Sequence, residues 1–113
     1  HTIGHAIEKL SHFSIQHGEG VSIGMSIVNT IAVSKKWMTK KDATYIKSLL
    51  KLYGLPTKLA RAINNVKLIN ALKLDKKVSN GKKQFIIATK LGRVKLSTSI
   101  TNRDITQACK KHA

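Results

Sequence analysis

The stretch HGEGVSIGMSIVNTIAV, residues 17–33, decides the fold, because its apolar residues recur at the spacing of an α-helix. These residues form two rows along the helix: Val21, Met25, Val28 and Ala32, and beside them Gly24, Ile27 and Ile31. So wide an apolar stripe predicts burial on more than one side. Asn29 and Thr30 are expected to face outward. Gly24 costs roughly 1 kcal/mol relative to Ala in a helix, which is tolerable where a neighbouring helix or ligand must approach closely.

Further helices are predicted on both sides of this stretch. Residues 1–10 carry apolar side chains at helical spacing, and residues 11–16 connect them to the long helix. Thr39 stands where a helix cap is expected and Gly54 where that helix would end. Thr57 is expected to cap a short helix that ends near residues 64 and 65. Helical spacing returns in two more ranges, 66–73 and 101–111.

The pattern changes after the fifth of these helices. Residues 84–89 are a short, apolar, β-rich run, and residues 93–98 alternate, with Val94 and Leu96 predicted to point inward. Residues 80–81, Asn-Gly, are expected to make a turn ahead of the first strand. The sequence therefore predicts a mainly α fold with a small β-hairpin near the C-terminus.

Length and composition fit one domain over residues 1–113. A chain of this size buries roughly two-thirds of the surface that its unfolded form exposes, which supports one core and not two. Cys109 is the only cysteine, so a disulfide framework is excluded and a reducing, cytoplasmic location is expected. The longest apolar stretch is residues 21–33, short of the roughly 20 residues that cross a bilayer, so no membrane partner is expected.

The net charge of +16 suggests nucleic acid as a partner, but the residue types argue against it. The 21 cationic residues include only three arginines, the side chain that reads base edges best: Arg61, Arg93 and Arg103. Aromatic side chains, on which single-stranded bases stack, are few and scattered. A solvated lysine face explains the charge equally well.

Three histidines near the start of the chain could carry chemistry. His1 and His5 are four residues apart, a spacing that puts both imidazoles on one helix face, where they can share a metal ion or flank a substrate. His17 stands before Gly18 at the start of the long helix, and a tight connector can bring it to His1. Spacing alone also fits exposed surface histidines. Glu8 and Glu19 are the nearby carboxylates.

Three motifs in this order resemble the C-terminal domain of the dehydroquinate synthase family, of the sugar-phosphate cyclase superfamily. They are HTIGHAIE at residues 1–8, HGEGV at residues 17–21 with Gly-Met at 24–25, and DKK at residues 75–77 with Gly81 and the strand Phe-Ile-Ile at 85–87. The resemblance spans nearly the whole chain. It implies the helical, metal- and substrate-binding C-terminal domain of such an enzyme.

The resemblance also implies roles for particular residues. His1 and His17 correspond to zinc ligands, with cobalt or another divalent cation as a possible replacement, and His5 to the histidine that transfers protons beside the substrate. Lys76 or Lys77 supplies a lysine that binds the substrate; without the family, a solvated charge run is the simpler interpretation.

The other histidines and the nearby acids are expected to play supporting parts. Glu8 and Glu19 are expected to serve helix ends or to hydrogen-bond the histidines, and not to bind metal. His12 and His112 match no motif and are expected on the surface.

For the intact enzyme, the resemblance implies a lyase, 3-dehydroquinate synthase. It converts 3-deoxy-D-arabino-heptulosonate 7-phosphate to 3-dehydroquinate and phosphate with NAD and zinc, on the shikimate route to chorismate and the aromatic amino acids. The intact enzyme is expected to be a homodimer. The family's NAD-binding N-terminal domain, its carboxylate zinc ligand and several substrate contacts just before His1 are missing. The chain is therefore expected to be a piece of the enzyme, inactive alone.

Two alternatives remain open. Another sugar-phosphate cyclase would use the same metal and NAD on a different sugar phosphate. A basic nucleic-acid-binding module would instead gather Lys and Arg on a face away from the three histidines.

Overall fold

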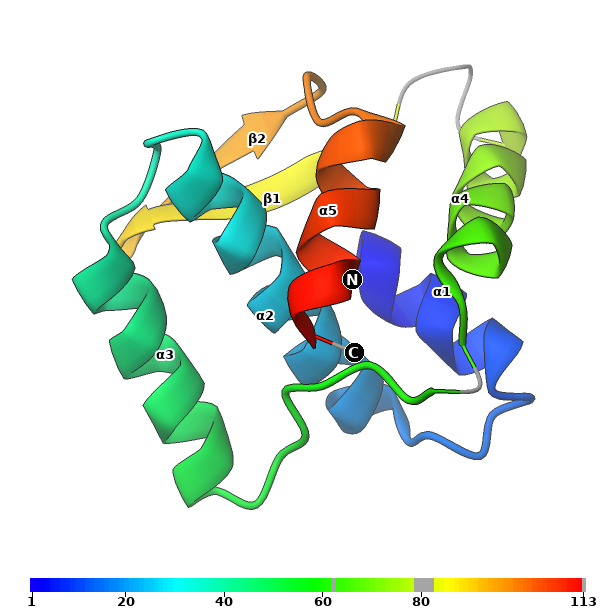
Figure 1. Ribbon diagram of the computed structural model, residues 1–113, viewed down its shortest axis with the longest axis horizontal. Coiled ribbons are helices and arrows are strands. Elements are labelled where there is room, and N and C mark those ends of the chain that lie inside the picture. Colours follow the sequence, from blue (N-terminus) through cyan, green and yellow to red (C-terminus); the bar gives the residue numbers. More distant parts are fainter. Residues whose placement is uncertain (62, 79–82, 113) are drawn as a thin grey trace.

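The computed structural model describes residues 1–61, 63–78 and 83–112, and the side chains of these residues except 75–78. Within them are five helices and one two-stranded antiparallel sheet, which lies at one edge of the helices beside α2 (Figure 1). The elements are α1 (Thr2–Leu10), α2 (His17–Ser34), α3 (Lys40–Leu52), α4 (Asn65–Val78), β1 (Phe85–Lys90), β2 (Arg93–Ser97) and α5 (Asn102–His112). The prediction of a mainly α fold with a small hairpin near the C-terminus is confirmed. None of the described helices is long and apolar enough to span a membrane.

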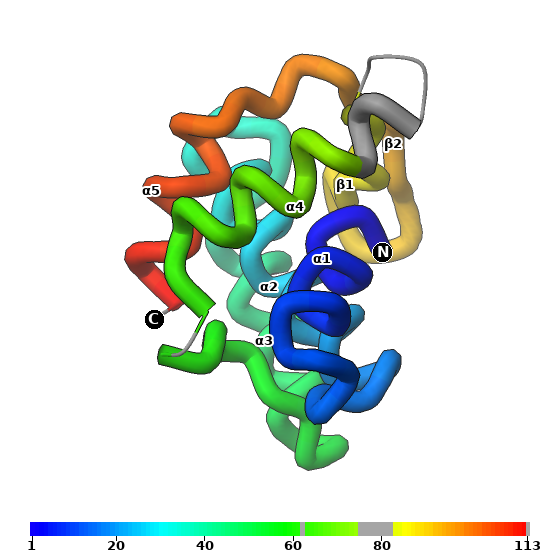
Figure 2. The backbone as a smooth tube through the Cα atoms, turned by 90° about the vertical axis from the view of Figure 1, so that its right-hand side faces the viewer, coloured from blue at the N-terminus to red at the C-terminus, as the bar shows by residue number. Residues whose placement is uncertain are grey.

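Helix α2 is the centre of the molecule, because α1, α3, α5 and β1 all pack against it. Its row of Gly24, Ile27 and Ile31 is buried, as the wide apolar stripe predicted. The second row is not buried throughout, since Met25 is 40% exposed. Helix α4 packs against α1 on the side away from α2. Figure 2 shows α4 and α1 from the side. One continuous core therefore joins all the helices.

Polar side chains fix where three of the helices begin. The Glu19 carboxylate accepts the backbone N–H of Gln16 ahead of α2, at 2.9 Å. The Thr39 hydroxyl oxygen accepts the N–H of Asp42 at the start of α3, at 3.2 Å, as predicted. Thr101 and Asp104 cap α5 by the same reciprocal pairing of side chain and backbone. Each bond satisfies an N–H that has no partner within its helix.

The prediction of a short helix after Thr57 is wrong for the described residues of that range. The chain runs as an irregular segment from Leu55 to Ala60, and tertiary hydrogen bonds replace helical ones. The Thr57 carbonyl accepts the Nδ1–H of His112 at 3.0 Å, and the Leu59 N–H donates to the His112 carbonyl at 2.6 Å. Because these backbone groups are satisfied by α5, a helix would gain nothing here.

The face of β2 that points to solvent is the one that was predicted to point inward. Val94 and Leu96 are 65% and 57% exposed, and they pair with Ala88 and Ile86 on the outer face, where of these four residues only Ala88 packs against the core. The inner face is formed by Phe85 and Ile87 of β1, both buried against the helices. Alternation along one strand identifies two faces but does not say which is inside. The predicted turn at residues 80–81 lies outside the described residues.

Candidate metal centre

Glycines bring α1 and α2 into backbone contact. A Cβ on Gly4 would lie 3.0 Å from the carbonyl oxygen of Gly20, and a Cβ on Gly24 would lie 3.0 Å from the backbone nitrogen of Gly4. A side chain at either position would require the two backbones to move apart by a few tenths of an ångström, so glycine allows the helices to cross this closely. The close approach expected at Gly24 is therefore confirmed, and the neighbour is helix α1.

The crossing gathers His1, His5 and His17 into one cluster. His1 caps α1, His5 follows one turn later, and His17 opens α2. The ring centroids are 5.5 Å apart for His1 and His5, 5.2 Å for His1 and His17, and 5.4 Å for His5 and His17. The three imidazoles thus form a nearly equilateral triangle, although sequence spacing alone fitted separate surface histidines. The Thr2 hydroxyl donates to the Gln84 carbonyl at 2.8 Å, which ties the start of α1 to the hairpin.

The Glu8 carboxylate lies between two of these rings. Its oxygens are 3.1 and 3.2 Å from Nδ1 of His17, and one of them is 3.2 Å from Nδ1 of His5. Glu8 is only 8% exposed, whereas both histidines are open to solvent. The Nδ1 atom of His17 forms a hydrogen bond with this carboxylate and the Nδ1 atom of His5 lies in contact distance of it, so both rings turn Nε2 away from Glu8. Glu8 therefore orients both imidazoles.

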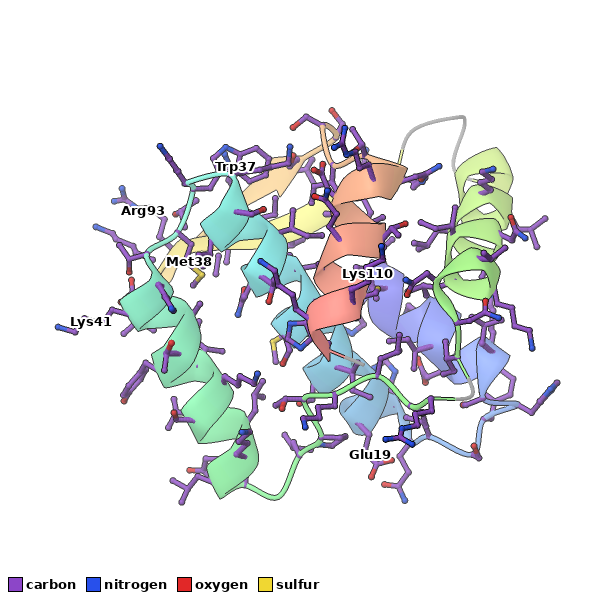
Figure 3. All side chains as sticks on the ribbon, in the orientation of Figure 1. Glu19, Trp37, Met38, Lys41, Arg93 and Lys110 are labelled. Carbon is purple, nitrogen blue, oxygen red and sulfur yellow. The ribbon has the colours of Figure 1, made fainter. Side chains whose placement is uncertain are left out.

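Glu19 has a different part, as a cap of α2. Figure 3 places it at the N-terminal end of that helix, and its carboxylate accepts the Gln16 N–H. Glu19 thus serves a helix end, as predicted, and Glu8 contacts the histidines; that Glu8 does not bind metal stays a prediction.

The donor atoms in the cluster fit a divalent metal ion. Ligand atoms of His5, Glu8 and His17 lie within 4.8 Å of one another. Zinc–nitrogen and zinc–oxygen bonds are about 2.0–2.2 Å long, so donors around one zinc ion lie closer together than 4.8 Å and these side chains would move toward one another on binding. Imidazole and carboxylate are donors that zinc and similar cations prefer. His1, whose ring is beside both histidines, is a further donor for the same ion.

A cavity of about 360 Å³ opens beside His1. Its walls are mostly apolar and come from α2 and the hairpin, including Met25, Phe85 and Val94. The cavity gives the cluster a neighbouring space with room for a small molecule.

Two lysines outside the histidine cluster were also predicted to belong to the site. The side chains of Lys76 and Lys77 lie outside the described part of the chain, so their predicted role stays a prediction.

His12 is exposed, as expected, but His112 is 4% exposed and not on the surface. A signal was available, because Ile105, Ala108, Cys109 and His112 recur at the spacing of one buried helix face. Burial raises the pKa of the Cys109 thiol to about 11, which leaves it unreactive.

A family model described as "3-dehydroquinate synthase C-terminal" matches residues 1–78 of this chain. The chain belongs to this family. It is 40% identical over 108 residues to a 3-dehydroquinate synthase from Nostoc sp., covering 95% of this chain and 30% of that protein. It is 42% identical over 95 residues to one from Prochlorococcus marinus, covering 83% of this chain and 26% of that protein. The chain thus spans about 30% of the length of such relatives.

Two solved structures share the fold. One is 2-epi-5-epi-valiolone synthase from Streptomyces hygroscopicus, with NAD+ and Zn2+ bound, at a TM-score of 0.86 and 21% identity; it covers 96% of this chain and 31% of that one. The other is 2-deoxy-scyllo-inosose synthase, at a TM-score of 0.76 and 23% identity, covering all of this chain and 31% of that one. The architecture of α1 to α5 is therefore that of a domain found in cyclases.

Proposed function

We propose that the chain is the metal- and substrate-binding C-terminal domain of a 3-dehydroquinate synthase. The observation that carries this proposal is the triangle of His1, His5 and His17, two of whose rings contact Glu8, in a chain that belongs to the family. The intact enzyme converts 3-deoxy-D-arabino-heptulosonate 7-phosphate to 3-dehydroquinate and phosphate, in the cytoplasm and as a homodimer. The domain that binds NAD belongs to a longer protein, and the 113 residues alone are inactive.

His1 and His17 hold the metal ion, zinc or another divalent cation such as cobalt. When bound, zinc acts as a Lewis acid on a substrate hydroxyl and NAD accepts and returns the hydride. The chain's own part begins with α1 and α2, whose glycine crossing sets the distance between the two histidines. Glu8 then holds the His17 ring by Nδ1, so that its Nε2 lone pair can face a metal ion.

His5 moves protons at the substrate. It is half-exposed at the end of the cluster, so a bound substrate can reach its ring. A Glu8 oxygen lies 3.2 Å from its Nδ1, so Nε2 is the nitrogen left to take a proton from the substrate and give it back. One buried carboxylate thus prepares two imidazoles for different tasks, metal binding at His17 and proton transfer at His5.

Lysines hold the anionic groups of the substrate. Lys76 or Lys77 contacts it directly, as the Asp-Lys-Lys motif implies. The net charge of +16 attracts a substrate that carries a phosphate dianion and a carboxylate, which gives the lysines a role that needs no nucleic acid.

A different sugar-phosphate cyclase is the nearest rival, and sequence identity favours the synthase. Relatives named 3-dehydroquinate synthase are 35–42% identical to this chain, whereas the two other cyclases are 21% and 23% identical. A nucleic-acid-binding module is the rival of another class. It rests on the net charge alone, and it gives no reason for a buried carboxylate between two histidines.

The experiment is an assay of the intact protein that contains these residues. We expect phosphate release from the heptulosonate phosphate with NAD and zinc, abolished by a chelator and by His17→Ala, but unchanged in His12→Ala, whose side chain is exposed and outside the cluster. Release of phosphate with a different carbocyclic product would favour another cyclase. No release, with salt-sensitive DNA binding that zinc leaves unchanged, would favour the binding module.

A further inference from the structure

A second cavity, of about 440 Å³, lies well away from the histidine cluster. Its walls come from the C-terminal half of α2, the first turns of α3 and the end of α5. Thr30, which lines it, is 13 residues after His17 on α2, a separation of about 20 Å along the helix axis. This cavity is therefore not part of the candidate metal centre.

The rim of this cavity is positively charged. Lys40 and Lys47 from α3 and Lys111 from α5 line it, and no Asp or Glu does so among the described residues. None of the three lysines forms an ion pair within the part of the chain that the structure describes. Three ammonium groups around one hollow repel each other, so a bound anion would relieve that repulsion.

One wall holds an amide that has no hydrogen-bond partner among the described residues. Asn29 is 8% exposed, and its side chain makes no hydrogen bond to any described residue. It lines this cavity and also the one beside His1. No described side-chain nitrogen or oxygen that is fully shielded from solvent lacks a partner, so the Asn29 amide atoms are open to the cavity, where a ligand can supply a bond. A ligand oxygen in the cavity would do so by accepting from the Asn29 amide nitrogen.

Two hydrogen bonds hold His112 in the wall of the cavity. His112 donates by Nδ1 to the Thr57 carbonyl at 3.0 Å, and its Nε2 is 2.6 Å from the Thr30 hydroxyl. Burial lowers the pKa of His112, and the nearby charges of Lys47 and Lys111 lower it further. The other walls include Val33 and Ala43, which offer apolar surface.

We propose that this cavity binds a small organic anion. Carboxylate or phosphate groups of the ligand pair with Lys40, Lys47 and Lys111 and accept from Asn29, while its apolar body covers Val33 and Ala43. A volume of about 440 Å³ is in the range of pockets for small metabolites. Inorganic phosphate alone would leave the apolar walls uncovered, so it binds more weakly than an anion with a hydrocarbon body. The site is independent of the function proposed for the histidine cluster.

The test is a titration of the isotope-labelled chain with phenyl phosphate, followed by nuclear magnetic resonance. We expect saturable shifts of the Val33 and Ala43 amides and of the His112 ring, and none with phenol, which has the same ring without the charge. Inorganic phosphate should shift the same signals with lower affinity.

Variants separate this site from general attraction to a cationic protein. Lys47→Ala and Lys111→Ala should each weaken phenyl phosphate binding about three- to ten-fold, and Asn29→Ala should weaken it with no change in net charge. Lys51→Ala is the matched control, since Lys51 is exposed on the same helix but does not line the cavity. Three results would each overturn the proposal. They are equal losses of phenyl phosphate affinity in Lys47→Ala and Lys51→Ala, signal shifts centred on His5 and His17, and binding that does not saturate.

Discussion

Gly24 of α2 lies so close to Gly4 of α1 that a Cβ on Gly24 would come within 3.0 Å of the Gly4 backbone nitrogen. The neighbouring atom is backbone, so it cannot move aside as the end of a flexible side chain would. The same crossing holds Gly20, whose carbonyl oxygen would meet a Cβ on Gly4 at 3.0 Å. The distance between the histidines on the two helices is therefore set by the absence of side chains at the crossing.

Gly24→Ala should push α1 away from α2. Alanine raises helix propensity by roughly 1 kcal/mol, but overpacking a helix contact costs typically 1–3 kcal/mol, so we expect a net loss of stability. Because His1 and His5 move with α1, zinc affinity should fall as well. Thermal unfolding and a zinc titration of the same sample measure both effects.

Gly18→Ala is the control for this prediction. A Cβ on Gly18 would meet no heavy atom within 4 Å, although Gly18 is also in α2. We expect unchanged or slightly raised stability and unchanged zinc affinity. A Gly24→Ala protein as stable as Gly18→Ala, with the same affinity for zinc, would contradict the role given to the crossing.

Glu8→Gln should weaken zinc binding with little change in fold. The amide keeps the shape of the side chain, but it has one acceptor oxygen where the carboxylate has two for Nδ1 of His5 and His17. Loss of a group that orients a metal ligand costs about 10- to 100-fold in metal affinity. Calorimetric titration with zinc measures the change, and Glu19→Gln is the control because Glu19 caps α2.

The same titration distinguishes two ligand sets. If His1 and His17 hold the ion, His1→Ala should weaken binding at least as strongly as Glu8→Gln. If His1→Ala binds zinc normally and Glu8→Gln does not bind it, the ligands are His5, Glu8 and His17, whose donor atoms lie within 4.8 Å of one another.

The helices could be predicted because their signals are local. Apolar spacing along α2, the Thr39 cap and the glycine after α3 are each recorded within a few residues of sequence. Gly24 even indicated a close neighbour, although nothing in the sequence identified Gly4 as that neighbour. The three histidines met as predicted because a short connector joins their helices.

The errors involve contacts between distant parts of the chain. Asn29 is buried and not outward, because α3 and the hairpin both approach α2 near it. Thr57 does not start a helix, because α5 satisfies its carbonyl from 55 residues away. The place of Glu8 between His5 and His17 depends on the crossing angle of two helices, which residue spacing does not contain.

The hairpin offers a direct test of which face is buried. Ile87→Ala should cost about 2–5 kcal/mol, because Ile87 is fully buried in the core. Leu96→Ala should cost less than about 1 kcal/mol, because its side chain is exposed on the outer face. Urea unfolding of the two variants measures the difference. Equal losses would mean that the outer face is covered in solution.

His112 should make the stability of the chain depend on pH. Burial is the main reason that its pKa lies below the ordinary value of 6.5; Lys47 and Lys111 act in the same direction, and the Thr57 bond opposes them. The unfolded chain then binds a proton more readily than the folded chain. Stability is therefore full above about pH 6.5 and falls as the pH drops through the lowered pKa of the folded state.

Replacing the imidazole isolates this effect. His112→Gln should lose about 1–3 kcal/mol at neutral pH, since the Thr57 carbonyl and the Thr30 hydroxyl lose a well-placed partner. Its stability should then fall less steeply than that of the parent chain between pH 7 and pH 5. The four other histidines are present in both proteins, so the difference between the two curves belongs to residue 112. Urea unfolding at several pH values gives both curves, and His12→Gln, which changes an exposed ring, should follow the parent curve. Parallel curves for the parent and His112→Gln would mean that the folded chain accommodates the charged ring as readily as water does.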